Sequence, residues 1–293
     1  MTAVPIAYLI LAHHRPRQLA RLVDRLRTPR SRFYVHVSAR TREETYAAMR
    51  DAVGERPDVL WLPRIPVYYG GFSQVRPMLA GVHALLGDEP RPGHAVLLSG
   101  QDYPLRPAAE IERHLAARPG TSFLHSFPLP APERWPGEDG GLDRIQRYYI
   151  ERVALRTRLL RVPLVRRRFP SELRPFGGMT WWALADVALV ELDRFAREHP
   201  DVVAFFRHVK MPDEIFVQSV LMSSPVADTI VNEPVHYAEW PGGSHAATFT
   251  AADLERLLGS GKLFARKFDE DVDSEILDLL DQEARHGAFR RPA

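Results

Sequence analysis

The chain has 293 residues, enough for one large α/β domain or two smaller domains to bury a substantial core. Hydrophobic residues make up 45% and charged residues 26% of it, which excludes the disordered, collagenous and coiled-coil classes. With 39 basic and 37 acidic residues the formal net charge is only +2, which argues against a dedicated nucleic-acid-binding protein. The absence of cysteine excludes disulfides, thiolate metal sites and cysteine nucleophiles.

The first hundred residues alternate between two hydrophobic patterns. Continuous apolar runs predict buried strands at 6–11, 33–37, 59–62 and 94–98. Apolar residues at helical spacing predict helices at about 19–26, 43–52 and 73–86. This alternation is typical of a mixed, mostly parallel central sheet with helices on both faces. The apolar run at 6–12 is too short for a signal peptide or a membrane span, so we expect a cytoplasmic protein.

The second half of the chain begins with a long Pro- and Gly-rich surface loop at 127–141. The patterns after it predict, in order, an arginine-rich helix at 144–168, a strand at 179–184, helices at 186–198 and 212–222, a strand at 235–240, a capping box at 250–253 and a last helix from about Asp273. No linker of distinct composition divides the chain, so we expect a single domain over 1–293.

Common phosphate-binding and nucleophile motifs are missing, which disfavours dehydrogenase, P-loop and α/β-hydrolase functions. Polar residues instead follow the predicted strands: His13, Ser38, Asp102 and the turn at 69–71. Loops at the carboxyl ends of parallel strands usually hold ligands. Each residue alone is also consistent with an ordinary turn.

Two acidic residues, Asp213 and Glu214, directly follow Pro212 at the start of a predicted helix. Carboxylates are favoured at this position by the helix dipole, and one of them could equally serve as a general base. The spacing alone leaves both interpretations open.

Two of the three lysines, Lys262 and Lys267, lie with Arg266 between aromatic residues. In a chain that otherwise uses arginine, a lysine there is consistent with a site for a phosphate. The alternative is a solvated basic turn balanced by the acidic run at 269–273.

Arginines also crowd the segment from Arg152 to Arg168, interleaved with apolar residues. This pattern fits a solvated face, an acidic partner or peripheral contact with an anionic membrane. Trp181 and Trp182 would point to opposite faces of a strand, so only one of them can reach a ligand. Trp240 ends a strand at a loop, where it could stack on a sugar ring or pack against the protein.

Several of these segments, taken together in chain order, resemble the Core-2/I-branching glycosyltransferase family, which includes branching β-1,6-N-acetylglucosaminyltransferases and protein O-xylosyltransferases. The segments are AYLILAHH at 7–14, FYVHV at 33–37, VYYGGFS at 67–73, LSGQDYP at 98–104, PDE at 212–214, Trp240 and LFARKFD at 263–269. The resemblance implies a GT-A fold, a UDP-sugar donor, inversion at the anomeric carbon and no divalent metal. It also implies a nucleotide-sugar-binding half at 1–126 and an acceptor and catalytic half at 127–293.

The same resemblance assigns roles to individual residues. Glu214 is expected to deprotonate the acceptor hydroxyl, and Lys267 to neutralise the leaving diphosphate in place of a metal. Residues expected to bind the nucleotide sugar are Ala12, His13, Ser38, Tyr69, Gly70, Asp102, Arg266 and Lys267. Residues expected to bind the acceptor are Arg147, Trp181, Trp240 and His245. The acceptor itself would be a carbohydrate, a glycoconjugate or a small hydroxyl compound, with no nucleic-acid partner.

The chain also departs from the animal members of the family. Ser38 stands where they usually carry an aspartate, and residues 242–247 contain no match for an arginine that assists with the diphosphate. Lacking cysteine and an anchor, the chain resembles a bacterial, cytoplasmic relative. GlcNAc or xylose is the expected sugar. The alternatives are a non-catalytic nucleotide- or carbohydrate-binding module of the same fold and a metal-dependent GT-A transferase.

Overall fold

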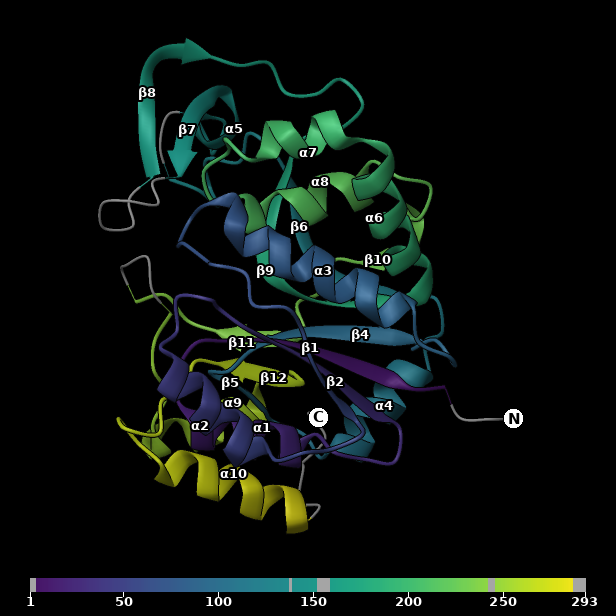
Figure 1. Ribbon diagram of the computed structural model, residues 1–293, viewed down its shortest axis with the longest axis vertical. Helices are drawn as coiled ribbons and strands as arrows, with labels where there is room; N and C mark the ends of the chain where they lie inside the picture. The colour runs from purple at the N-terminus through teal and green to yellow at the C-terminus, as the bar shows by residue number, and fades with distance from the viewer. Residues whose placement is uncertain (1–3, 137–138, 152–158, 242–245, 287–293) are drawn as a thin grey trace.

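The computed structural model describes residues 4–136, 139–151, 159–241 and 246–286, and its centre is a seven-stranded sheet (Figure 1). The sheet order is β10-β6-β9-β4-β1-β2-β3. Its strands are β1 (Ile6–Ala12), β2 (Ser31–Val37), β3 (Val59–Trp61), β4 (His94–Ser99), β6 (Ser122–Pro128), β9 (Phe176–Ala185) and β10 (Ile230–Val231). β1 pairs in parallel with β2 and β4, whereas β9 runs antiparallel to β4 and β6. The prediction of a mixed, mostly parallel sheet is confirmed.

Helices cover both faces of this sheet, as predicted (Figure 1). The lower face in that view carries α1 (Pro16–Arg25), α2 (Glu43–Val53), α4 (Ala108–Ala116), α9 (Leu254–Gly259) and α10 (Glu275–His286). The upper face carries α3 (Val75–Leu86), α6 (Asp186–Glu198), α7 (Pro200–Phe206) and α8 (Phe216–Met222). Short 3₁₀ turns complete the chain at η1 (Phe72–Gln74), η2 (Pro212–Glu214), η3 (Ala227–Thr229) and η4 (Ala251–Asp253).

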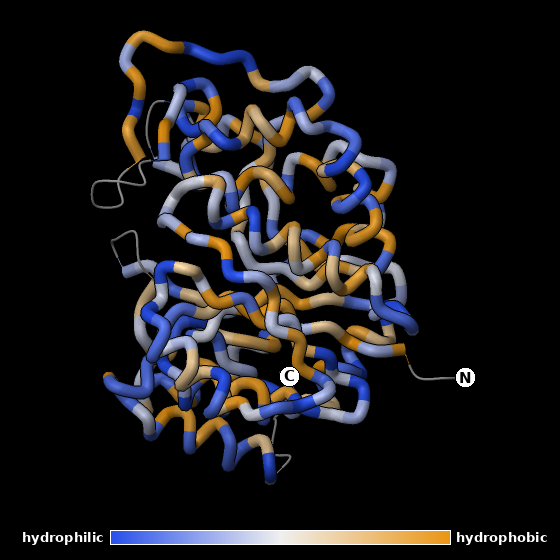
Figure 2. The backbone as a smooth tube through the Cα atoms, viewed as in Figure 1, coloured by the Kyte–Doolittle hydropathy of each residue, from blue (hydrophilic) through white to orange (hydrophobic). Residues whose placement is uncertain are grey.

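The central strand β1 is buried on both faces of the sheet. Tyr8 and Ile10 belong to one hydrophobic cluster, and Ala7 and Leu9 to the other, because successive side chains of a strand point in opposite directions. Figure 2 shows the resulting hydrophobic centre, with polar residues gathered on the outer helices. A continuous apolar run is therefore what a central strand needs.

A second, three-stranded sheet has the order β11-β12-β5, with β5 (Asp102–Pro104), β11 (His236–Ala238) and β12 (Phe264–Arg266). β12 is antiparallel to β5, and the register places Arg266 opposite Asp102. The capping box predicted at Thr250 is confirmed, because its hydroxyl and the Asp253 carboxylate each accept from the other residue's backbone N–H.

The predicted arginine-rich helix at 144–168 is wrong. The chain forms a short helix α5 (Asp143–Gln146) and then an antiparallel hairpin of β7 (Arg147–Glu151) and β8 (Leu159–Arg166). Pro163 cannot donate a helical hydrogen bond, and the valines beside it favour a strand. Residues 152–158, which carry part of the predicted basic segment, lie outside the described residues.

The predicted helix at 212–222 is interrupted. Its first three residues form η2, and Ile215 leaves the helical region (φ −132°, ψ −39°) before α8 begins at Phe216. The two carboxylates therefore lie on a tight turn. In the described part of the chain no helix is long and apolar enough to cross a bilayer.

Candidate active site

The carboxyl ends of the parallel strands β1, β2 and β4 meet at one edge of the sheet. The backbone N–H of Ser38 donates to Ala12 O at 3.2 Å, and Gly100 N donates to Leu11 O at 3.0 Å. The loops that carry His13, Ser38 and Asp102 consequently start side by side. This is the arrangement that the sequence predicts.

Ser38 is buried and its hydroxyl is used inside the protein. Ser38 Oγ accepts from the backbone N–H of Val67 at 3.2 Å and of Arg40 at 3.3 Å. These bonds hold the start of the segment that leads to Tyr69. The nucleotide contact expected of Ser38 stays a prediction.

The turn that carries Asp213 and Glu214 is fastened to the glycine turn at 70–71. Met211, with a left-handed backbone (φ 53°), donates its N–H to Gly70 O at 2.8 Å. Gly70 itself has φ +80°, a conformation that favours glycine. The glycine turn and the acidic turn are therefore one structural unit.

Asp213 is buried beneath this turn. Its Oδ2 accepts from Thr180 Oγ1 at 2.9 Å and from Gln74 Nε2 at 3.3 Å, whereas Oδ1 has no hydrogen-bond partner in the described part of the chain. Burial, and next the neighbouring Glu214, raise the pKa of Asp213 to about 7, and the Thr180 hydrogen bond opposes the shift.

Glu214 reaches the surface of the turn and forms an ion pair with Arg144. Arg144 Nη1 donates to Glu214 Oε2 at 2.5 Å, and the guanidinium lies 3.7 Å from the centre of the Trp135 ring. Burial raises the pKa of Glu214, while the charge and hydrogen bond of Arg144 oppose the rise. A carboxylate that is more basic than in water and is held in one orientation can accept a proton from a hydroxyl.

Arg144 is a residue that the sequence analysis missed. It lies 70 positions from Glu214, in a segment predicted to be part of a basic helix. No local spacing joins the two residues, and only the position of α5 beside η2 brings them together.

Tyr69 lies in the electric field of the same carboxylates. Burial is the largest cause that raises the pKa of its hydroxyl, and the negative charges of Glu214 and then Asp213 raise it further. The positive charges of Arg144 and Arg266 lower the pKa and so oppose this rise. Its side chain is still half exposed, so the predicted donor contact is available to it.

A second cluster is centred on Asp102, which is fully buried. Its carboxylate accepts from Ser99 N and Ser99 Oγ, both at 2.8 Å, and lies 3.4 Å from Arg266 Nη1 and 3.4 Å from His236 Nε2. Burial alone would raise the pKa of Asp102, but Arg266 first and then His236 hold it below its ordinary value. The Arg266 guanidinium also lies 4.0 Å from the centre of the Trp181 ring.

Lys267 follows Arg266 but occupies a different environment. Its loop is fixed because Phe268 N donates to Gln101 O at 2.8 Å, and Gln18 Nε2 donates to Phe268 O and Gly100 O, both at 3.1 Å. Among the described residues the Lys267 side chain has no hydrogen bond or ion pair. Its charge is one of the causes, after burial and Arg15, that lower the pKa of His14 at the end of β1.

The residues predicted to bind the acceptor are not all brought together. Trp181 packs on the guanidinium of Arg266, whereas Trp182 is fully buried. The two side chains point to opposite faces of β9, as expected of neighbours in a strand. Arg147 on β7 and Trp240, which is 49% exposed, form no hydrogen bond, ion pair or ring contact with Glu214 in the part of the chain that the structure describes. His245 lies outside the described residues.

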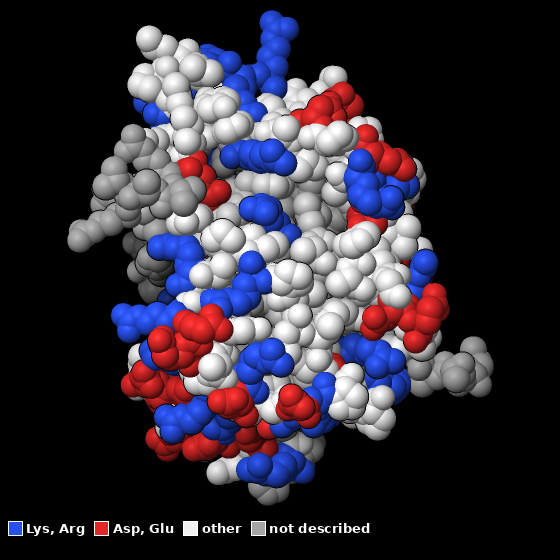
Figure 3. All heavy atoms as spheres, viewed as in Figure 1, with Lys and Arg blue, Asp and Glu red and all other residues white. Residues whose placement is uncertain are grey.

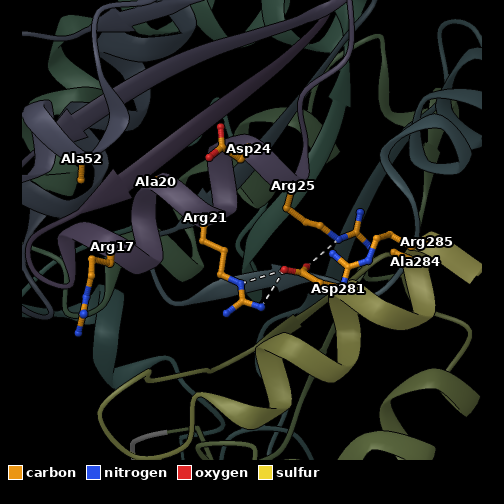
Figure 4. A pocket seen from close by; sticks show the side chains of 9 residues that line it. All are labelled: Arg17, Ala20, Arg21, Asp24, Arg25, Ala52, Asp281, Ala284 and Arg285. Atoms are coloured by element: carbon orange, nitrogen blue, oxygen red, sulfur yellow. Dashed lines mark hydrogen bonds and ion pairs between the residues drawn. The ribbon is translucent and has the colours of Figure 1, made fainter.

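Among all the described residues, no three His, Asp or Glu side chains converge as a metal site would require. An open hollow of about 720 Å³ does lie between α1 and α10 (Figure 4). Arg21 Nη2 and Arg25 Nε point at Asp281 there, at 2.8 and 3.2 Å, and so fasten α10 to α1. Figure 3 shows positive and negative side chains alternating over this lower part, whereas the middle of the same face is mostly uncharged.

A family model described as Core-2/I-Branching enzyme matches residues 6–258. The chain belongs to this family. It is 27% identical over 305 aligned positions to xylosyltransferase 2 of Rattus norvegicus, covering 95% of this chain and 33% of that protein. It is 25% identical over 318 positions to a human beta-1,3-galactosyl-O-glycosyl-glycoprotein beta-1,6-N-acetylglucosaminyltransferase, covering 97% and 71%. The chain thus spans about a third of the length of the xylosyltransferases it matches.

Among solved structures, mouse xyloside xylosyltransferase 1 aligns over 75% of this chain and 83% of its own, with 12% identity and a TM-score of 0.33. A likeness of this size carries no argument about function. The family match confirms the resemblance, and six of the seven sequence segments lie within the matched residues.

Proposed function

We propose that this Core-2/I-branching protein transfers a glycosyl group from a nucleotide-linked sugar to an acceptor hydroxyl, with Glu214 as the general base. The observation that carries the proposal is the environment of Glu214, because burial raises its pKa while Arg144 orients its carboxylate at 2.5 Å. Family membership and the names of the relatives support the reaction class.

The mechanism is a single displacement. Glu214 takes the proton of the acceptor hydroxyl while that oxygen forms a bond to the anomeric carbon, and the bond from this carbon to the diphosphate breaks. Attack from the face opposite the diphosphate inverts the anomeric configuration. Negative charge grows on the leaving diphosphate, where a cation stabilises the transition state most strongly. Lys267 supplies that cation, since its ammonium has no partner among the described residues.

The donor proposed is a UDP-sugar, with xylose or GlcNAc as the sugar, and the reaction is proposed to need no metal. The relatives' names support the two sugars. The acceptor is proposed to be a carbohydrate or glycoconjugate that enters beside Glu214 and Tyr69.

Replacing Glu214 by Gln tests the base directly. Glu214→Gln keeps the size of the side chain and removes its basicity, so transfer should fall by about 10²- to 10⁴-fold. A ligand that binds only the folded state raises the melting temperature, so UDP binding can be measured in this way. The rise on adding UDP should be unchanged in Glu214→Gln, because Glu214 is not among the residues expected to bind the nucleotide. Transfer retained by Glu214→Gln would refute the assignment.

A panel of nucleotide sugars, each tested with EDTA and with Mn²⁺, separates this proposal from its rivals. Stabilisation by a UDP-sugar and release of UDP, both persisting in EDTA, are expected. UDP binding without release from any donor would identify a binding module instead. Loss of activity in EDTA and recovery with Mn²⁺ would identify a metal-dependent transferase.

A further inference from the structure

The hairpin of β7 and β8 projects from the rest of the molecule, at the upper left in Figure 1. It forms a two-stranded sheet of its own, and most residues of β8 are exposed. A two-stranded hairpin has little intrinsic stability in water.

Apolar side chains occupy this outer surface. Ile150 and Leu160 lie directly opposite each other in the strand pairing and are 42% and 39% exposed. Leu164 is 99% exposed, more than any other large hydrophobic residue in the described chain. Removing such groups from water is favourable, so the surface has an apolar binding capacity that the protein itself does not use.

The backbone presents Leu164 outward. The pairing shifts between Arg147, which faces Arg166, and Tyr148, which faces Val162, so three residues of β8 have no opposite partner. Leu164 is the middle one and has φ +62°, a left-handed conformation that is unfavourable for a residue with a Cβ. The exposed leucine in this conformation forms an apolar tip.

Three arginines flank Leu164 along the chain. The side chains of Arg161, Arg166 and Arg168 form no hydrogen bond or ion pair within the part of the chain that the structure describes. Arg167 differs, since it donates to His208 O at 2.9 Å and to Phe205 O at 2.6 Å and so anchors the hairpin. Glu151 is the one acidic residue of β7 and β8, and its carboxylate accepts a hydrogen bond from Ser73 Oγ in the body of the protein.

We propose that this hairpin docks the protein on an anionic lipid surface, with Leu164, Leu160 and Ile150 entering the interface. The three unpaired arginines would lie at the level of the lipid phosphates, and arginine stems tolerate the apolar boundary. A soluble acidic partner would satisfy the arginines but would give the fully exposed Leu164 no apolar phase to enter. Apolar area combined with positive charge is the pattern of a peripheral membrane contact.

The docking surface is connected to the candidate active site, although the inference does not depend on catalysis. The Ser73–Glu151 hydrogen bond joins the last residue of β7 to the 3₁₀ turn η1, which directly follows Gly70 and Gly71. Docking through the hairpin would therefore bring the turn that bears Glu214 toward the membrane side of the protein.

Sedimentation of the whole chain with vesicles tests the proposal. The protein should pellet with phosphatidylcholine vesicles that contain phosphatidylglycerol, should pellet little with phosphatidylcholine alone, and should be released by salt. The double variant Arg161→Gln/Arg166→Gln should weaken binding about 30-fold, since each arginine near such a surface contributes about 1 kcal/mol. Leu164→Asp should weaken it at least as much.

Two variants elsewhere provide matched controls. Val272→Asp places the same charge at another exposed apolar residue, and Arg113→Gln neutralises an exposed arginine on α4, at the other end of the molecule. Both should bind vesicles like the wild type. Equal loss in the controls, or no preference of the wild type for anionic vesicles, would overturn the proposal. Dimers in sedimentation velocity that Leu164→Asp dissociates would instead show that the hairpin joins two copies.

Discussion

The guanidinium of Arg144 donates a hydrogen bond of 2.5 Å to the carboxylate of Glu214, and the two residues come from segments 70 positions apart. The bond fixes the direction of the proposed base. It also counteracts the effect of burial, which would otherwise raise the pKa of Glu214 further. Arg144 therefore acts on the reaction through Glu214 and is a positioning residue.

Arg144→Gln should shift the pH dependence of transfer. Without the positive charge, the pKa of Glu214 rises, and the carboxylate is deprotonated only at higher pH. The acid limb of kcat/KM should move up by about one pH unit, because a neighbouring opposite charge shifts a carboxyl pKa by that order. A pH profile of kcat/KM measures this.

Arg144→Lys restores a charge and should return the acid limb toward its original position. Arg134→Ala removes an exposed arginine near Trp135 that forms no ion pair with a described residue, and it should leave the limb unmoved. An unchanged pH profile in Arg144→Gln would show that the ion pair does not govern the base.

Lys267→Ala should weaken both UDP binding and the rate of transfer. A charge-assisted contact to a phosphate is worth about 1.5–3 kcal/mol, which corresponds to roughly 10- to 100-fold. Calorimetric titration with UDP and kcat/KM report the two effects. Lys262 is a matched control in the same segment, since its ammonium already pairs with Glu233 at 3.2 Å. Equal losses in Lys262→Ala and Lys267→Ala would contradict the assignment.

Gly70→Ala should destabilise the fold. The residue has φ +80°, and a Cβ there would lie 3.1 Å from a Leu159 methyl carbon and 3.2 Å from Met211 Sδ. Backbone strain alone should lower the free energy of unfolding by about 1 kcal/mol or more. Gly259→Ala, at a helical position where a Cβ meets nothing within 4 Å, should not lower it. Urea unfolding compares the two variants, and equal stabilities would contradict this account.

The sequence predicts most of the central sheet because β1 and β4 are buried on both faces and leave a continuous apolar signal. It does not predict the three-residue strands β5 and β12, which are too short to show a period. The sequence predicts a helix where the hairpin of β7 and β8 lies, because interleaved arginines and apolar residues fit both a helical and a strand period.

The candidate site also contains residues that the sequence predicts and contacts that only the structure shows. Glu214 and Lys267 stand out because of local composition and the family resemblance. The Arg144–Glu214 pair and the position of Arg266 against Asp102 depend on contacts between distant segments, which no local spacing encodes. Grouping Arg266 with Lys267 as neighbouring cations was natural in sequence, yet their side chains lie in different clusters.

Asp213→Asn should make the protein more stable at high pH than at low pH, relative to the wild type. Burial raises the folded-state pKa of Asp213 to about 7, far above its ordinary value of 3.8. A raised folded-state pKa contributes stability at pH values below the unfolded-state pKa, and this stability is lost as pH rises through the folded-state pKa. Between pH 5 and pH 8 the wild type should therefore lose stability, because up to about pH 7 the carboxyl is ionised in the unfolded chain but still protonated in the folded protein. Asparagine mimics the protonated group and still accepts from Thr180. The free energy of unfolding of Asp213→Asn minus that of the wild type should increase by at least about 1 kcal/mol over this range, measured by urea unfolding at both pH values. A difference that is independent of pH would show that Asp213 is already ionised in the folded protein at pH 5.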